Sequence, residues 1–187
     1  MSQLSPILPL HRVNTLTGVR TSRVVEDPKD IVKQIKKAQR PLLVIGPLTT
    51  KVTLGDKLLI EYAIDIAKAG NIPICATATT KAKLLEFGVK PDSVYDVVEI
   101  VNALKDPNWK GVRGEGNHDL ILFLGIRTDL ANQGLSTLKH FAPHLSTITL
   151  CKYYHPHADY SLPNIRKDDQ WKSILEGIIE NLKTENR

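Results

Sequence analysis

Short runs that are almost wholly apolar are the feature that most constrains how this chain folds. The clearest are residues 42–46 and 119–125, and residues 72–77 and 146–151 have the same character. A strand with one face in water alternates apolar and polar residues, whereas a strand that is apolar throughout is buried on both faces. These runs alternate with segments of helical periodicity. We therefore predict an α/β fold with a doubly wound, mostly parallel, Rossmann-like sheet.

The helical patterns fill the intervals between these runs. The first begins at Pro28, behind Asp27 as N-cap, and ends at the Arg40–Pro41 step, because a residue before proline disfavours the helical conformation. Further helices are predicted over residues 55–69, 80–87, 93–104, 130–141 and 168–182. Residues 106–117 contain one proline and three glycines, which is typical of a loop. We predict a single domain over residues 27–187, preceded by an N-terminal arm over residues 1–26.

Positive charge is concentrated at the N-terminus. The formal net charge is +5, and residues 1–40 account for all of it. The basic residues in this stretch are Arg12, Arg20, Arg23, Lys29, Lys33, Lys36, Lys37 and Arg40, against the acids Glu26, Asp27 and Asp30. A cationic arm suits an acidic partner surface, with Arg12, Arg20 and Arg23 as predicted contacts. The alternative is a solvated terminus with no specific role.

Composition also bears on location and partners. No apolar run approaches the length of a membrane span, and Pro6 and Pro9 interrupt the short apolar stretch near the start that could resemble a secretory signal. We therefore expect a cytoplasmic protein that is not bound to a membrane. Nucleic-acid binding would require basic residues interleaved with aromatics, but aromatic residues make up only 5% of the chain. A nucleic-acid partner is not expected.

The two cysteines, Cys75 and Cys151, both lie in apolar runs and are expected to be reduced core residues. Two thiols cannot supply the four thiolates of a usual iron–sulfur cluster. His155 and His157, with Cys151 nearby, form the densest group of potential metal ligands, but no second pair with zinc-like spacing completes it. We predict no metal site and no catalytic residue, since no nucleophile motif is present either.

A cofactor site is predicted where the parallel strands end, because ligands of such sheets bind at the carboxyl ends of the strands. Small and hydroxyl-bearing residues gather there and could hold the diphosphate of a nucleotide or flavin, with an arginine as partner. The residues are Gly46, Pro47, Thr49, Thr77, Thr79, Gly125 and Arg127. The alternative is that Thr49, Thr79 and Asp129 only cap the helices that follow. The strict dinucleotide and phosphate-loop fingerprints are absent.

Several strings of the chain resemble the epsilon subunit family of acetyl-CoA decarbonylase/synthase from anaerobic archaea. They occur in order across residues 18–182. The strings are GVRTSRVV at 18–25 with AQRPLLVIG at 38–46, AGNIPICAT at 69–77, LKDPNWKG at 104–111 with GNHD at 116–119, QGLSTLK at 133–139, and LCKYYHP at 150–156 with SLPN at 161–164. The string at residues 40–46 also resembles the central domain of thiamine-diphosphate enzymes, which shares the doubly wound architecture and sometimes binds FAD.

The resemblance implies an accessory role without catalytic residues of its own. Epsilon subunits are understood to join a large nickel–iron–sulfur alpha subunit, with two copies of each in a heterotetramer. This assembly is the carbon monoxide dehydrogenase component, which interconverts CO and CO2 in one-carbon metabolism and methanogenesis. The implied role is to stabilise the alpha subunit or to assist electron transfer to FAD. The arm and Trp109, in the 106–117 loop, are the predicted contacts, and self-association is also open. Trp109 could instead pin its own loop to the core.

An independent flavin- or nucleotide-binding protein is the alternative function, supported by the chemistry of the strand ends. The chain departs from the family pattern in two places. The glycine-rich loop carries Arg113 and Glu115, and Cys151 stands where an acid that binds ribose would be expected.

Overall fold

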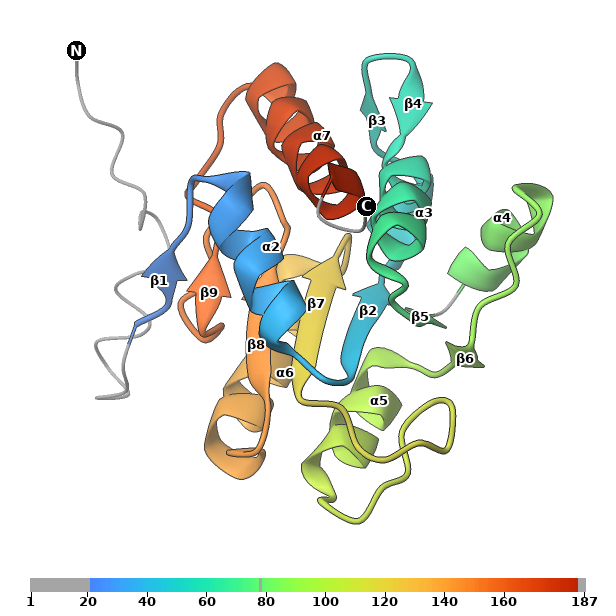
Figure 1. The fold of residues 1–187 in the computed structure, drawn as a ribbon, viewed down its shortest axis with the longest axis vertical. Helices are drawn as coiled ribbons and strands as arrows, with labels where there is room; N and C mark the ends of the chain where they lie inside the picture. The colour runs from blue at the N-terminus through green and yellow to red at the C-terminus, as the bar shows by residue number, and fades with distance from the viewer. Residues whose placement is uncertain (1–20, 78, 185–187) are drawn as a thin grey trace.

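Seven parallel strands form one sheet in the computed structural model, which describes residues 21–77 and 79–184 (Figure 1). The sheet order is β1-β9-β8-β7-β2-β5-β6. Counted from β2 along the chain, the six strands from β2 to β9 in this sheet follow the order 3-2-1-4-5-6 of a dinucleotide-binding fold. The strands are β1 (Arg23–Val24), β2 (Pro41–Ile45), β5 (Ile74–Ala76), β6 (Ser93–Val94), β7 (Leu120–Leu124), β8 (Ser146–Thr149) and β9 (Tyr160–Ser161).

Helices cover both faces of the sheet. Figure 1 shows α2, α3 and α7 together on one face, where α7 packs against both of the others. Helices α5 and α6 pack against each other on the opposite face, and α4 lies near the β6 edge. The helices are α2 (Pro28–Lys37), α3 (Leu59–Gly70), α4 (Thr80–Glu86), α5 (Val97–Lys105), α6 (Thr128–Phe141) and α7 (Asp168–Thr184). The predicted doubly wound α/β fold is confirmed.

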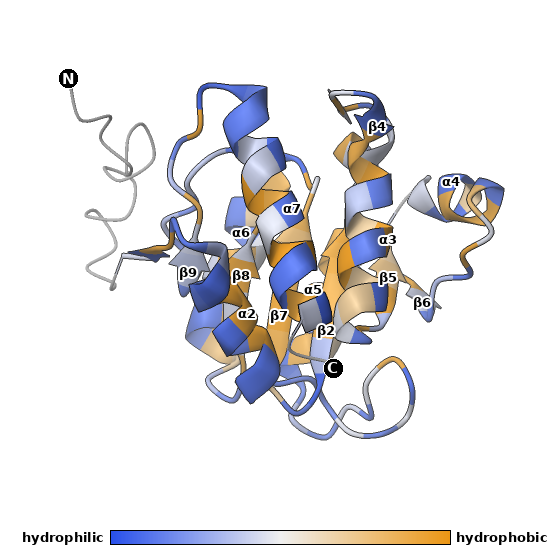
Figure 2. Cartoon of the chain, turned by 45° about the horizontal axis from the view of Figure 1, so that its top comes forward, coloured by the Kyte–Doolittle hydropathy of each residue, from blue (hydrophilic) through white to orange (hydrophobic). Residues whose placement is uncertain are grey.

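Successive residues of the central strands enter different cores. In β2, Leu43 and Ile45 belong to the core beneath α2, α3 and α7, whereas Leu42 and Val44 belong to the core beneath α5 and α6. All four are fully buried. This alternation follows from the period of two along a strand, and it explains why the central strands are apolar at every position. Figure 2 shows the hydrophobic residues concentrated along these strands and on the helix sides that face them.

Two predicted helices begin later than expected. The helix predicted from residue 55 begins at Leu59, because the chain first forms a 3-10 turn, η1 (Pro47–Thr50), and an antiparallel hairpin of β3 (Thr53–Leu54) and β4 (Lys57–Leu58). Gly55 has a φ of 67°, which suits the hairpin turn and not a helix. The helix predicted from residue 93 begins at Val97, since Ser93 and Val94 pair with β5 as strand β6.

The edge strands were not predicted. β1 pairs with β9 through Arg23 and Tyr160, so residues at the end of the predicted arm contribute the outermost strand of the sheet. The division into an arm over residues 1–26 and a domain over 27–187 stays a prediction. Within residues 21–77 and 79–184, no helix combines the length and apolar character that crossing a membrane requires.

Candidate functional site

The crevice between β2 and β7 is where a doubly wound sheet offers a ligand site, because the strand order reverses there. In this chain the two strand ends touch. Gly125 accepts a hydrogen bond from the Leu48 amide at 2.9 Å. A Cβ on Gly46 would lie 2.5 Å from the Gly125 carbonyl oxygen, and a Cβ on Gly125 would lie 2.4 Å from Cγ2 of Thr49. Glycine at both positions therefore lets η1 close over the crevice.

The backbone donors that could hold a phosphate at this point are already engaged. Pro47 has no amide hydrogen, the Leu48 amide is bonded to Gly125, and the Thr49 amide donates to the Gly46 carbonyl at 3.0 Å. At the start of α3, the Leu59 amide donates to Val52 at 2.9 Å. A diphosphate would have to break these bonds, so this part of the predicted site does not fit the group as it stands.

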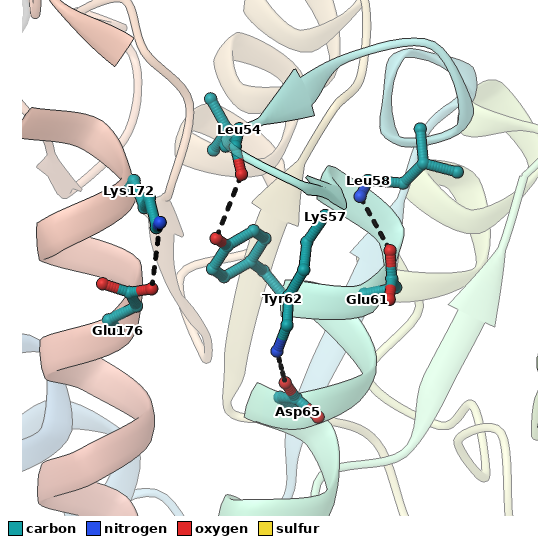
Figure 3. A network of polar contacts seen from close by, with 8 residues as sticks. All are labelled: Leu54, Lys57, Leu58, Glu61, Tyr62, Asp65, Lys172 and Glu176. Atoms are coloured by element: carbon teal, nitrogen blue, oxygen red, sulfur yellow. Dashed lines mark hydrogen bonds and ion pairs between the residues drawn. The ribbon is translucent and has the colours of Figure 1, made fainter. Parts of the chain in front are cut away.

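A carboxylate also occupies the start of α3. Glu61 accepts a hydrogen bond from the Leu58 amide at 2.7 Å, which satisfies one amide at the start of the helix with a negative charge (Figure 3). Beside it, the buried Tyr62 hydroxyl donates to the Leu54 carbonyl at 3.3 Å and fastens the β3–β4 hairpin to α3. Burial, followed by the nearby carboxylates of Glu176, Asp56, Glu61 and Asp65, raises the pKa of Tyr62.

The predicted hydroxyls point into the protein. Thr49 Oγ1 donates to the Gly46 carbonyl at 2.7 Å, and Thr77 Oγ1 donates to the Ile45 carbonyl at 2.8 Å; both residues are buried. Thr79 is exposed and makes no side-chain cap for α4. These geometries describe where the residues lie, and their assignment to a cofactor stays a prediction.

Arg127 lies on the surface, where its guanidinium binds Asp129. The Nη2–Oδ2 distance is 2.7 Å and the Nε–Oδ1 distance is 3.2 Å. The hydrogen bonds from Arg127 are the main reason that the pKa of Asp129 is lowered. Both side chains are more than half exposed, so the pair is open to water and ions. An anionic ligand at the start of α6 would compete with Asp129 for this guanidinium.

A cavity of about 290 Å³ opens beside the closed crevice, at the carboxyl ends of β7 and β8. Its walls are mostly apolar, and they come from η1, the turn before α3, the two strand ends and the start of α7. The lining residues are Leu48, Val52, Leu59, Gly125, Ile126, Thr128, Cys151, Lys152, Tyr153, Asp168 and Trp171. Of the predicted cofactor residues, Gly125 lines this cavity.

Trp171 and Cys151 fix the inner wall of the cavity. The Trp171 indole donates to the Leu150 carbonyl at 2.9 Å, which ties α7 to the end of β8. Burial raises the pKa of the Cys151 thiol to about 11, so the thiol is neutral at physiological pH. At the rim, Lys152 forms an ion pair with Asp168, and Tyr153 is 53% exposed. Sequence reasoning did not place Trp171 at a site, because its position depends on how α7 packs against the end of β8.

The two histidines considered as metal ligands are packed into the protein. His155 is buried, with Nδ1 3.0 Å from Asn132 Oδ1 and its backbone amide donating to Ser161. Burial, and then the neighbouring His157, lower the pKa of His155 to about 4. Among the residues that the structure describes, no three His, Cys, Asp or Glu side chains gather in a way that could hold a metal ion.

The predicted partner contacts lie apart from the cavity. Arg12 and Arg20 fall outside the described residues, and Arg23 is exposed on β1. Trp109 is half-buried between the rings of Tyr95, 6.3 Å away, and His118, 5.7 Å away. His118 Nε2 accepts from the Val112 amide at 3.2 Å, so Nδ1 carries the hydrogen that is donated to the Arg40 carbonyl. Trp109 thus packs against the base of its own loop while keeping part of its surface in water.

Comparison with known proteins identifies one matching family model and several similar proteins. A family model described as CO dehydrogenase beta subunit/acetyl-CoA synthase epsilon subunit matches residues 5–179. The acetyl-CoA decarbonylase/synthase complex subunit epsilon of Methanothermobacter thermautotrophicus is 46% identical over 149 residues, which cover 80% of this chain and 82% of that protein. Subunit epsilon 1 from Archaeoglobus fulgidus is 40% identical over 157 residues, covering 83% and 82%. Subunit epsilon 1 from Methanosarcina barkeri is 37% identical over 165 residues, covering 88% and 92%.

Proposed function

The chain belongs to the family of CO dehydrogenase beta subunits and acetyl-CoA synthase epsilon subunits, and from this membership we propose that it is a non-catalytic accessory subunit of an acetyl-CoA decarbonylase/synthase complex. The observation that carries the proposal is the extent of the match, from residue 5 to residue 179. The relatives named as epsilon subunits of that complex are covered over at least 82% of their own lengths. The similarity therefore concerns the whole subunit and not a shared nucleotide-binding half.

The proposed partner is the large nickel–iron–sulfur alpha subunit, two copies with two copies of this chain, in the cytoplasm. In that assembly the alpha subunit would carry out CO oxidation and CO2 reduction as part of one-carbon metabolism and methanogenesis. This chain would stabilise the alpha subunit or assist electron transfer to FAD. The buried, neutral state of Cys151 supports a structural part for this chain, since a thiol with a pKa of about 11 is a poor ligand and a poor nucleophile near neutral pH.

Co-expression with the large subunit tests the proposal directly. We expect the two chains to co-purify, with a mass by light scattering that fits two of each. The alpha subunit alone is expected to lose CO-oxidising activity faster on heating than the assembly, because a bound partner stabilises the folded state. The proposal would be contradicted if this chain were recovered from native extract without the large subunit. Both proteins should be at about 10 µM or more in that experiment, so that even a complex of micromolar affinity would stay associated.

A flavin or nucleotide is the second candidate, as part of the complex or in an independent protein, and the cavity beside Trp171 is the observation that favours it. At about 290 Å³ the cavity is just below the usual range for ligand sites, so it suits one planar ring system better than an entire dinucleotide. Titration calorimetry with FAD, NAD and ADP separates the options. A Trp171→Phe variant should weaken any ligand seated in the cavity. Absence of heat and of a thermal shift with all three ligands would exclude this candidate.

A further inference from the structure

A second, smaller pocket opens at the amino ends of β2 and β5, at the opposite end of the sheet from the cavity beside Trp171. It lies against the loop that joins α5 to β7, which runs below the strands in Figure 1. Its volume is about 170 Å³, below the usual range for an organic ligand, so it suits a single small group. The ionisable side chains in its lining are Arg40, Arg113, Glu115 and His118. We call it the amino-end pocket.

The loop holds Arg40 in a fixed position. Arg40 Nε donates to the Asn117 carbonyl at 2.6 Å, and the Arg40 carbonyl bonds His118 Nδ1 at 3.0 Å. Gly116 lets the loop lie directly against the guanidinium, since a Cβ on Gly116 would be 3.4 Å from Nε and 3.5 Å from Cζ of Arg40. These contacts position the guanidinium without using its two Nη groups.

Arg113 brings a second guanidinium to the same pocket. Its Nε donates to Asp92 Oδ1 at 2.7 Å, and Asp92 Oδ2 accepts from the Ile74 amide at 2.8 Å, which anchors the pair to the start of β5. Within residues 21–77 and 79–184, the Nη atoms of Arg40 and Arg113 make no hydrogen bond or ion pair. Each arginine therefore still has two charged donor groups for an anion in the pocket.

The nearby carboxylates leave these donors open. Both oxygens of Asp92 are bonded, and those of Asp119 accept from the amides of Gln39 and Arg40 at 2.7 and 2.8 Å. Glu115 also lines the pocket, but it is exposed and forms no ion pair with another described residue. An entering anion would compete with Glu115 alone, and an exposed side chain can turn toward water.

His118 lies where the two positive charges converge. Burial is the main cause of its lowered pKa, and the charges of Arg40 and Arg113 act in the same direction. Its Nε2 accepts from the Val112 amide at 3.2 Å, so both ring nitrogens are occupied by the protein. His118 therefore forms part of the wall, and the guanidinium groups are the donors left for a ligand.

We propose that the amino-end pocket binds a phosphate group through Arg40 and Arg113, either as free phosphate or as a phosphate monoester whose remainder stays in solvent. The oxygens of a phosphate point in several directions, so two guanidinium groups on different sides can each bind it, whereas a carboxylate presents a single edge. The site is separate from the cavity considered for a flavin or nucleotide, and it does not depend on the proposed partner subunit.

Titration calorimetry of the full chain with sodium phosphate at about pH 8 tests the site, with sodium chloride at equal ionic strength as the reference. We expect a dissociation constant of about 1 mM or lower. Arg40→Gln and Arg113→Gln should each weaken binding about tenfold, because each removes charged hydrogen-bond donors. The matched control is Arg166→Gln, which removes the same charge at an exposed position elsewhere and should stay within about twofold of the unmodified chain.

A substitution that strengthens binding separates recognition from folding. Glu115→Gln keeps the size of the side chain but removes the negative charge that shares the pocket, so phosphate should bind about threefold more tightly. A damaged fold could weaken binding in the arginine variants, but it could not produce this gain. Unchanged or weaker binding in Glu115→Gln would contradict the proposed position of the phosphate.

Glycerol phosphate in place of inorganic phosphate distinguishes the two sources of the group. The ligand that binds more tightly identifies the source, and binding of either supports the site. The proposal is overturned if neither ligand gives heat beyond the chloride reference, if acetate binds as tightly as phosphate, or if Arg166→Gln weakens binding as much as Arg40→Gln does. The accessory role is tested with the large subunit and stands or falls independently of these results.

Discussion

The crevice between β2 and β7 and the segment that follows β8 lie at the same edge of the sheet, yet they bury their polar groups in different ways. In the crevice, the Leu48 and Thr49 amides and the Thr49 hydroxyl all find backbone acceptors within 3.0 Å. In residues 150–161, by contrast, the Nδ1 atom of His157 is buried with no hydrogen-bond partner, and the buried His155 is held neutral. We therefore expect substitutions in the crevice to change stability through packing, whereas residues 150–161 should make stability depend on pH.

Side-chain size explains the difference. Glycine at positions 46 and 125 lets two backbones approach until no space is left between them. After β8 the chain carries larger side chains, and the cavity there is lined by Cys151, Lys152 and Tyr153 together with Trp171 of α7. Tyr154 nevertheless has a structural task, since its hydroxyl donates to the Ser22 carbonyl at 2.9 Å and holds the start of β1. A closed crevice and a neighbouring segment with buried histidines predict different responses to mutation and to pH.

Gly125→Ala is expected to have the largest effect. Gly125 has a φ of 69°, and an added Cβ would lie 2.4 Å from Thr49 Cγ2 and 2.8 Å from the Thr49 nitrogen. Backbone strain and overpacking together should lower the free energy of unfolding by about 4 kcal/mol, measured by urea denaturation. Gly88→Ala is the matched control, because Gly88 has a φ of 70° with nothing within 4 Å of the added Cβ. Gly88→Ala should lower the free energy of unfolding by about 1 kcal/mol. If Gly125→Ala and Gly88→Ala lowered the free energy of unfolding equally, the crevice would not be tightly closed.

His155 should make stability depend on pH. Its pKa is about 4 in the folded chain, against 6.5 for the ordinary side chain, mainly because burial disfavours the charged form. The unfolded chain therefore binds a proton between about pH 6.5 and 4 that the folded chain does not, so stability falls as pH falls through this range. The loss between pH 7 and pH 5 should be about 2 kcal/mol.

A His155→Gln variant isolates this contribution. The amide can still bond Asn132 but does not titrate, so the difference in unfolding free energy between pH 7 and pH 5 should shrink. The groups that also face this region are His157 and, beyond it, Lys139, His140 and Asp159. Burial lowers the pKa of His157 as well, so part of the pH dependence should persist in the variant. An unchanged pH dependence would mean that His155 is not buried in its neutral form.

Thr49→Val probes the crevice with a smaller change. Valine keeps the shape of the side chain but removes the hydroxyl that donates to Gly46 at 2.7 Å. The expected loss is about 1 kcal/mol in urea denaturation, because a buried carbonyl is left with one bond fewer. Thr50→Val is the control, since the Thr50 hydroxyl makes a similar bond to Pro47 at a half-buried position where water can replace it. A larger loss of unfolding free energy for Thr50→Val than for Thr49→Val would contradict the interpretation that the Thr49 hydrogen bond is the one shielded from water.

The central part of the fold could be predicted because its signal is local. Residues 42–45 and 120–124 are apolar throughout, and each lies in a strand buried on both faces. The short strands toward the two sides of the sheet have no comparable signature. Strands β1, β6 and β9 are two residues long, and their pairing is decided by the strand beside them and not by their own composition. The β3–β4 hairpin was missed because the residues that form β4 also fit the first turn of the helix predicted from residue 55.

The candidate site could be predicted only as a region. Sequence order places Gly46 and Gly125 at strand ends, but their contact depends on which strands are neighbours and on the absence of a side chain at either position. The cavity depends on residues brought together by the docking of α7, such as Leu48 and Trp171. The hydroxyls of Thr49 and Thr77 could have pointed outward to a ligand, and only the tertiary structure decides that they bond the backbone.

The last prediction needs no substitution: it compares how easily a small reagent reaches a cysteine in the cavity and one in the core. Cys151 lines the cavity, whereas Cys75 is fully buried in β5, and burial raises the pKa of both thiols to about 11. Because the thiolate fractions are then alike, a difference in labelling rate reports access alone. In the native chain, iodoacetamide should label Cys151 at least tenfold faster than Cys75, as measured by mass spectrometry of the two peptides. In urea the two rates should converge. Equal rates in the native chain would mean that the cavity is closed to small molecules, and the segment after β8 would then be sealed like the crevice.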